Sequence, residues 1–208
     1  MNPEVAPASI SEAGLGQPSK ATRRSSAVRR TLAVGAGAII IALSAQVVMP
    51  VPFSPVPMTL QPLAVLAVGG LLGGTAGLAA LVLYIGLGLA GLPVFAGGGS
   101  GLLRLIGPTG GYLMAFPVAA WATGALVSPA LALGGRTGTG AVLRVLLACA
   151  LAIVIIHVGG VAQLAVLGLD PSTAFRVGFI PFLTGDLLKV GLAAALILAA
   201  GPRIRSLL

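Results

Sequence analysis

An acidic and a basic residue lie three positions apart in the segment Gly185–Lys189, which reads GDLLK. The stretch around them, from Val177 to Pro202, carries no other charge. A charged side chain in the middle of a membrane helix costs about 2.5–3.5 kcal/mol on insertion scales, so such residues usually serve a function. At this spacing Asp186 and Lys189 project from one helix face and can reach a common partner. The pair therefore indicates a buried polar site.

The residues alone leave two interpretations of Asp186 and Lys189 open. In the first, they form a structural ion pair that neutralises itself, although buried pairs are costly and hydrophobic replacements are often as stable. In the second, they belong to a ligand site in which Lys189 donates to an anion. Asp186 would then accept from N–H groups of the ligand or orient Lys189. Deeply placed charges that face a cavity are typical of such a site.

Arg104 lies between two glycine-rich stretches, GGGSG at residues 97–101 and GPTGG at residues 107–111, the second of which contains Thr109. We expect Arg104 just outside the membrane, either at the mouth of the site, where it would attract anions, or facing water. Glycines permit unusual backbone angles and a close approach to a ligand. The stretches are not a nucleotide-binding loop, because neither G-x-x-x-x-G-K-[ST] nor a strand context is present.

Aromatic and amide side chains gather on the same expected side of the membrane. They either line one outer pocket or, for the aromatic rings, anchor the chain at headgroup level. The aromatic candidates are Tyr112, Phe53 and Phe95, and the hydroxyl and amide candidates are Thr59, Gln61 and Gln46.

The composition is that of a multi-pass membrane protein and excludes an ordinary soluble domain. Of the 208 residues, 57% are hydrophobic and 8% are charged, and the mean hydropathy is +1.09. At roughly 20 residues per crossing, the uncharged stretch from Thr31 to Leu103 holds three transmembrane helices. Leu105–Gly135, Val145–Leu169 and Thr173–Ala200 supply three more. We therefore predict an all-α bundle of six transmembrane helices, with a short second and third crossing.

The charge distribution predicts that both termini are cytoplasmic. With six crossings, nine basic residues fall inside and only Arg104 and Arg176 fall outside, as the positive-inside rule requires. These nine are Lys20, Arg23, Arg24, Arg29, Arg30, Arg136, Arg144, Arg203 and Arg205. Topology thus accounts for most of the net charge of +8, which gives no reason to expect a nucleic-acid partner.

Two segments complete the predicted organisation. Residues 1–27 are polar and lack apolar periodicity, so we expect a disordered cytoplasmic tail before a membrane domain over residues 28–208. In the first crossing, Ala38 and Ala42 form a small-xxx-small pair, which serves either internal packing or the docking of a partner helix.

Cys149 is the only cysteine, and no cluster of metal ligands is present, so we expect neither a disulfide nor a metal.

Two other functions have weaker support. Ser100 in a G-x-S-G tetrapeptide and His157 in the fifth crossing suggest an intramembrane serine protease. The tetrapeptide is unspecific in a glycine-rich loop, however, and Asp186 would be unexplained; a buried hydrogen-bonding role suits His157 better. A proton-coupled carrier using Asp186 is the other alternative, although the sequence shows no convincing internal repeat.

Four blocks of sequence resemble the BioY family, the biotin-specific substrate-capture (S) subunits of energy-coupling-factor (ECF) transporters. They occur in order over about residues 31–200 and are specific. The blocks are VPMTLQPLAVLAVGGLLG (56–73), YIGLGLAGLPVFAGGGSG (84–101), GPTGGYLMAF (107–116) and PFLTGDLLKVGLAAAL (181–196).

The resemblance implies a compact six-helix fold in a bacterial plasma membrane that binds biotin from outside. It also implies a transmembrane coupling subunit and ATP-hydrolysing subunits as partners, which would topple the bundle toward the cytoplasm; the chain itself would be no enzyme and hold no cofactor. The family's D-x-x-K maps onto Asp186 and Lys189, and its first-helix docking pair onto Ala38 and Ala42. S components for other vitamins remain the alternative, and the resemblance leaves open whether the isolated chain forms a homo-oligomer.

Overall fold

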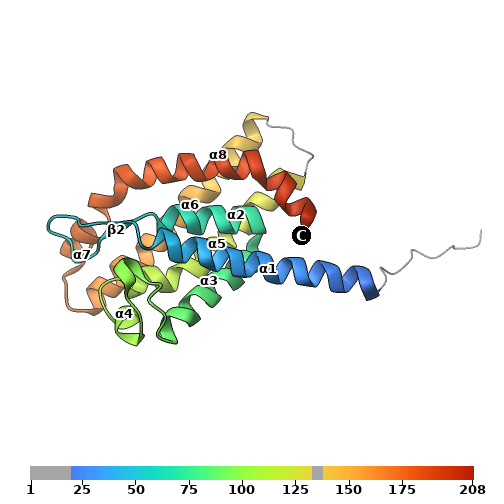
Figure 1. Cartoon of the computed structure of the whole chain (residues 1–208). Helices are drawn as coiled ribbons and strands as arrows, with labels where there is room; N and C mark the ends of the chain where they lie inside the picture. Colours follow the sequence, from blue (N-terminus) through green and yellow to red (C-terminus); the bar gives the residue numbers. More distant parts are fainter. Residues whose placement is uncertain (1–19, 133–137) are drawn as a thin grey trace, which may run out of the picture.

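A computed structural model of the chain describes residues 20–132 and 138–208, and most of these lie in helices (Figure 1). The α-helices are α1 (Lys20–Ser44), α2 (Gln61–Leu72), α3 (Gly74–Leu89), α4 (Leu102–Ile106), α5 (Gly110–Ala132), α6 (Thr139–Val166), α7 (Pro171–Gly178) and α8 (Leu183–Leu207). Two strands, β1 (Val48–Met49) and β2 (Met58–Thr59), and two 3₁₀ turns, η1 (Ala96–Gly98) and η2 (Ile180–Phe182), complete the described part.

Six of these helices, α1, α2, α3, α5, α6 and α8, pack against one another as a bundle. Figure 1 shows the beginning of α1 and the end of α8 at one end of the bundle, and α4, α7 and the β1–β2 segment at the other. The two termini of the described helical bundle therefore lie on the same side. An even number of passes through the bundle gives this arrangement.

Within residues 20–132 and 138–208, four segments are long and apolar enough to span a membrane: Ser25–Ser44, Gly110–Pro129, Thr139–Val166 and Pro171–Leu207. The expected second and third crossings correspond to the apolar helices α2, of 12 residues, and α3, of 16 residues. The prediction that these two helices are short is confirmed. The count of six complete crossings stays a prediction, because helices of this length span only about 18–24 Å.

Proline and glycine residues set the breaks between the first three helices. The segment between α1 and α2 contains four prolines, which cannot continue a helix. Its two ends instead pair as a short antiparallel ribbon, with Val48 opposite Thr59, a small exception to the predicted all-α fold. Between α2 and α3, Gly73 has a φ of 89°, a left-handed value that a residue with a Cβ rarely adopts. The chain therefore reverses there in a single residue.

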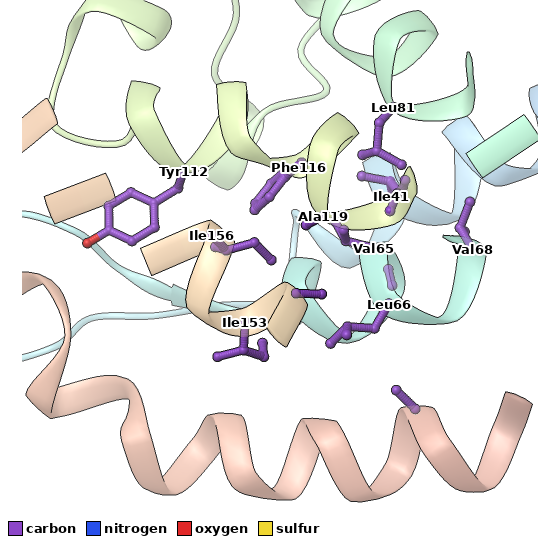
Figure 2. Packing of buried hydrophobic residues seen from close by; sticks show 14 of the residues in the cluster. Ile41, Val65, Leu66, Val68, Leu81, Tyr112, Phe116, Ala119, Ile153 and Ile156 are labelled. Carbon is purple, nitrogen blue, oxygen red and sulfur yellow. The ribbon is translucent and has the colours of Figure 1, made fainter. Parts of the chain in front are cut away.

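The bundle core is formed by aliphatic and aromatic residues, mainly from α1, α2, α3, α5, α6 and α8. Figure 2 shows Ile41, Leu66, Leu81 and Phe116 directed into this core. Backbones also approach closely where glycines face each other. A Cβ built on Gly111 of α5 would lie 2.0 Å from the Gly159 carbonyl oxygen of α6. Only glycine fits there, so this contact fixes α5 against α6.

The sixth predicted segment is not one continuous helix, which corrects the expectation for Thr173–Ala200. Helix α7 ends at Gly178 and α8 begins at Leu183, with η2 between them. Pro181 contributes to the break because it lacks a backbone N–H and disfavours a helical conformation at the residue before it. Asp186 consequently lies in the first turn of α8, where the positive end of the helix dipole stabilises a carboxylate.

Helix α1 begins at Lys20, so its first turns cover residues 20–27, the end of the range expected to be a disordered tail. Residues 1–19 lie outside the described residues. The expected docking pair lies toward the bundle: Ala38 is 2% exposed and Ala42 is half-buried against the core. Internal packing therefore describes Ala38 in this structure, and a docking role for the pair stays a prediction.

Arg205 joins three helices at the end of the bundle that carries the termini. Its guanidinium donates to the Gly70 carbonyl oxygen of α2 at 2.6 and 3.1 Å, and to Ser128 Oγ of α5 at 2.7 Å. The Gly70 carbonyl is in the last turn of α2, where carbonyl groups lack partners within the helix. Arg205 thus caps α2 and links it to α5 and α8.

Candidate functional site

One cavity brings together eight of the ten residues that the sequence suggested for a ligand site. They are Thr59, Gln61, Phe95, Arg104, Thr109, Tyr112, Asp186 and Lys189. They come from the ends of α2, α5 and α8 and from the connections at the end of the bundle opposite the termini. The remaining lining is largely apolar and includes Val56, Pro57, Leu113, Phe116, Ile156 and Phe182. An apolar cavity with a few convergent polar groups is the usual form of a small-molecule site.

Asp186 is the centre of the polar network in this cavity. Lys189 Nζ donates to Asp186 Oδ1 at 2.9 Å, and His157 Nε2 lies 2.6 Å from Asp186 Oδ2. All three side chains are buried, with exposures of 3% for Asp186 and 6% for each of the other two. The two interpretations of the Asp186–Lys189 pair are therefore compatible, because the residues form an ion pair and also line a cavity.

The break between α7 and α8 supplies a carbonyl group to the site. Gly178 is the last residue of α7, and in an uninterrupted helix its carbonyl oxygen would accept from the backbone four residues on. Here it accepts from Tyr112 Oη at 2.6 Å and lies 3.1 Å from His157 Nδ1. Side chains from α5 and α6 thus replace the missing helical bond and fix the break beside the cavity.

Gln61 and Thr59 form a second polar group at the start of α2. Gln61 is 4% exposed and donates through Nε2 to Tyr84 Oη at 2.8 Å, and Thr59 Oγ1 accepts from the Gln61 backbone N–H at 3.2 Å. The Tyr84 ring meets Phe95 edge-on with centroids 5.6 Å apart. This arrangement holds an amide oxygen and an aromatic ring at the cavity wall.

Arg104 and Thr109 lie at the mouth of the cavity. Thr109 Oγ1 lies 3.4 Å from the Arg104 carbonyl oxygen as a weak donor, and the Arg104 side chain is exposed. Both residues, with Pro57, also line an outer hollow between the α1–α2 connection and the segment around α4. The two ion pairs within residues 20–132 and 138–208 both use Asp186. Among these residues, Arg104 is thus a cation at the entrance with no acidic partner.

Two of the suggested pocket residues lie elsewhere. Phe53 is 98% exposed at the tip of the β1–β2 connection, so it does not line the cavity. The Gln46 amide donates to the Ala42 carbonyl oxygen of α1 at 2.9 Å and, more weakly, to the carbonyl oxygens of Val94 and Phe95 at 3.4 Å each, and the side chain does not line the cavity. Both residues lie in segments that the sequence places on the outer side of the membrane. This location alone does not determine whether a side chain points into the cavity.

His157 is the site residue whose contact with Asp186 the sequence did not predict. The expectation of a buried hydrogen-bonding residue was right, but its partners come from α7 and α8, which are 21 and 29 positions away. The available signal was that the only histidine of the chain stands in an otherwise apolar helix. Both ring nitrogens contact groups other than Ser100, so this geometry does not form the Ser–His dyad of the protease alternative.

Asp170 anchors the helix that carries Gly178. Its Oδ1 accepts from Ser172 Oγ at 2.6 Å and from the backbone N–H groups of Ser172 and Thr173 at 3.1 and 3.0 Å, so it is the N-cap of α7. The hydrogen bond from the Ser172 side chain, followed by those from Thr173, lowers the pKa of Asp170. The cap stabilises the carboxylate form.

We expect this cap to make the stability of α7 depend on pH. Because folding lowers the pKa of Asp170, its stabilisation is fully present above the pKa of the unfolded chain and is lost progressively as the pH falls from there through the lower pKa of the folded chain. In Asp170→Ala, the amides of Ser172 and Thr173 should exchange faster at neutral pH, as measured by hydrogen exchange. Asp170→Asn retains a capping side chain and should stay protected at both neutral and acidic pH; equal exchange in all three proteins would contradict the cap.

Fold and cavity together are those of a multi-pass helical membrane protein with a largely apolar cavity at the end of the bundle opposite the described termini. A family model described as the BioY family matches residues 18–206. The chain belongs to the BioY family.

Relatives support the same assignment. A probable biotin transporter BioY from Pyrococcus horikoshii is 36% identical over 149 residues, which cover 72% of this chain and 82% of the relative. The biotin transporter BioY from Rhizobium etli is 37% identical over 161 residues, covering 76% and 85%. The crystal structure of an S-component for biotin from an ECF-type ABC transporter superposes with a TM-score of 0.71 at 25% identity, covering 83% of this chain and 90% of that one.

Proposed function

We propose that this chain captures biotin as the S component of an ECF-type transporter. The observation that carries the proposal is the buried cavity in which Lys189, Asp186 and His157 meet apolar walls, in a chain similar to biotin transporters over most of its length. Biotin has a carboxylate for a cation, an apolar bicyclic body for aliphatic and aromatic walls, and ureido N–H groups for an acceptor. Each of these has a counterpart in the cavity.

Within this site we assign the biotin carboxylate to Lys189. Lys189 has three N–H donors and uses one on Asp186, so two remain for a ligand. Asp186 orients Lys189, and its oxygens retain lone pairs that a ureido N–H can reach. Phe95, Phe116 and Phe182 provide walls for the bicyclic body. Arg104 and Thr109 at the mouth attract the anion during entry.

The proposed topology has six crossings, both termini in the cytoplasm and the cavity open to the outside of a plasma membrane. The two termini of the bundle lie at the same end, and Arg29, Arg30, Arg203 and Arg205 are located there, which suits the positive-inside rule. The cavity is at the opposite end. Biotin would therefore enter from outside, with α2 and α3 crossing as short helices shielded by their neighbours.

Release into the cytoplasm would need partner subunits. We propose that a transmembrane coupling subunit, driven by ATP-hydrolysing subunits, topples the whole bundle until the cavity faces inward. Ala38 and Ala42 remain the proposed docking pair. Because Ala38 is buried in the isolated chain, docking at this position would require α1 to shift or the partner to contact Ala42 first.

Equilibrium binding of radiolabelled biotin to the purified, detergent-solubilised protein tests the proposal. We expect saturable 1:1 binding that excess unlabelled biotin removes and that thiamin or riboflavin leaves unchanged. Competition by another vitamin would instead identify an S component of different specificity. If folded protein bound none of these molecules, the biotin proposal would be wrong, and biotin-independent proton flux in proteoliposomes would then test the carrier alternative.

A further inference from the structure

His157 has a hydrogen-bond acceptor at each of its two ring nitrogens. Nδ1 lies 3.1 Å from the Gly178 carbonyl oxygen, and Nε2 lies 2.6 Å from Asp186 Oδ2. A carbonyl oxygen only accepts, and an ionised carboxylate only accepts. A neutral imidazole has one N–H and one bare nitrogen, so it satisfies only one of these contacts. To make both contacts hydrogen bonds, the pair needs one more proton than a neutral His157 and an ionised Asp186 carry together.

This extra proton has two places to lie, on His157 Nε2 or on Asp186 Oδ2. Lys189 Nζ donates to the other oxygen of the same carboxylate at 2.9 Å, and a neighbouring ammonium group favours the ionised carboxylate. Lys189 also compensates in part for the loss of water around Asp186. The contacts of the two carboxylate oxygens thus favour the proton on His157 Nε2.

The surroundings of His157 suit a cation that is paired on one side only. From α8 it faces Asp186 and, through that carboxylate, Lys189; from α5 it faces Tyr112, whose hydroxyl donates to the same Gly178 oxygen. The centroids of Phe179, Phe182 and Tyr112 lie 4.9, 5.8 and 5.9 Å from that of the imidazole. Aromatic rings at such distances can attract a cation without neutralising it.

Without His157, the charges of Asp186 and Lys189 would neutralise each other and leave little positive charge for the carboxylate of a ligand. We propose that His157 is a positioning residue of the biotin site: as an imidazolium it neutralises Asp186, so that the three-residue cluster keeps one net positive charge at Lys189 for the carboxylate of the ligand. This inference rests on the proposed function. It extends that function by explaining how a buried ion pair can also bind an anion.

The charge state of His157 can be measured directly because it is the only histidine in the chain. Protein labelled with ring-¹⁵N histidine would give two ring resonances that need no assignment among residues. In ligand-free protein at neutral pH, we expect both nitrogens in the range of protonated imidazole nitrogens, each coupled to a hydrogen. A resonance typical of a bare ring nitrogen would overturn the proposal.

A binding comparison tests the role of this charge. His157→Gln keeps an amide donor that can reach Asp186 and removes the positive charge. We expect the affinity for biotin to fall at least about tenfold, while biotinamide, which has a neutral tail, changes by less than about threefold; a tenfold change corresponds to ~1.4 kcal/mol. The ratio of the affinity for biotin to the affinity for biotinamide should therefore fall. Val158→Ala, on the same helix but 63% exposed and outside the cavity, should leave both affinities unchanged.

The outcomes separate the two proposals. Equal losses for biotin and biotinamide in His157→Gln would show a merely structural role and overturn this inference while biotin capture stands. Failure of the unsubstituted protein to bind biotin would instead overturn the proposed function. The nitrogen resonances still decide the charge state in that case, and also if His157→Gln does not fold.

Discussion

Replacing Lys189 with alanine is expected to abolish high-affinity biotin binding. The substitution removes the cation assigned to the biotin carboxylate. The Lys189 side chain is buried in the cavity and only 6% exposed. Removing one partner from a buried, hydrogen-bonded charge pair costs about 2–5 kcal/mol, which corresponds to a loss of affinity of roughly 30-fold to several thousandfold. Titration with radiolabelled biotin would measure this loss.

Asp186→Asn should weaken binding in the same assay, because it removes the carboxylate that orients both Lys189 and His157. Leu188→Ala is a matched control: this side chain lies on the same helix, is 66% exposed and is outside the cavity, so its affinity for biotin should be unchanged. Normal binding of biotin by Lys189→Ala, together with good binding of biotinamide by the unsubstituted protein, would contradict the assignment of the carboxylate to Lys189.

Gly111→Ala is expected to destabilise the bundle markedly, although it adds only one methyl group. A Cβ at this position would lie 2.0 Å from the Gly159 carbonyl oxygen and 2.5 Å from Gln163 Cβ. Backbone cannot rotate away as a flexible side chain can, so α5 and α6 must separate. We expect a loss of at least about 1–3 kcal/mol of folding stability, the usual cost of overpacking. Because Tyr112 is the next residue, the site should be disturbed as well.

The single cysteine provides the measurement. Cys149 is completely buried in α6, so a thiol-reactive fluorescent dye would label it only as the bundle opens on heating. Gly111→Ala should shift the labelling transition to lower temperature. Gly191→Ala serves as the control, since a Cβ there meets nothing within 4 Å and the residue is on the exposed face of α8. Equal transitions for the two variants would show that α5 and α6 tolerate the extra methyl group.

The amino-acid sequence predicted much of the candidate site because the relevant groups are rare in an apolar chain. Asp186 and Lys189 stand out as charges within a membrane segment, and Gln61, Tyr112 and Arg104 stand out as polar groups near expected helix ends. All of them line one cavity. Family resemblance, rather than composition, supplied the identity of the ligand.

Other features could not be predicted because they depend on contacts between distant segments. Hydropathy does not distinguish one long helix from α7, η2 and α8, since Pro171–Leu207 qualifies as a single candidate span. The direction of a side chain was equally undetermined: Phe95 is 1% exposed and Phe53 is 98% exposed, although both are aromatic residues in outer connections. Ala38 likewise is buried by the chain's own neighbouring helices, which a pattern of small residues alone cannot reveal.

The sequence by itself determined that this chain crosses a membrane several times, where most of its helices lie, and that it carries a charged pair within the apolar region. These properties follow from composition and local pattern, because a bilayer accepts only long apolar segments and makes buried charges costly. The tertiary structure alone decided that α7 ends at Gly178 and that its free carbonyl group faces Tyr112 and His157. It also decided that His157 meets Asp186, because helix packing sets the distance between residues 29 positions apart.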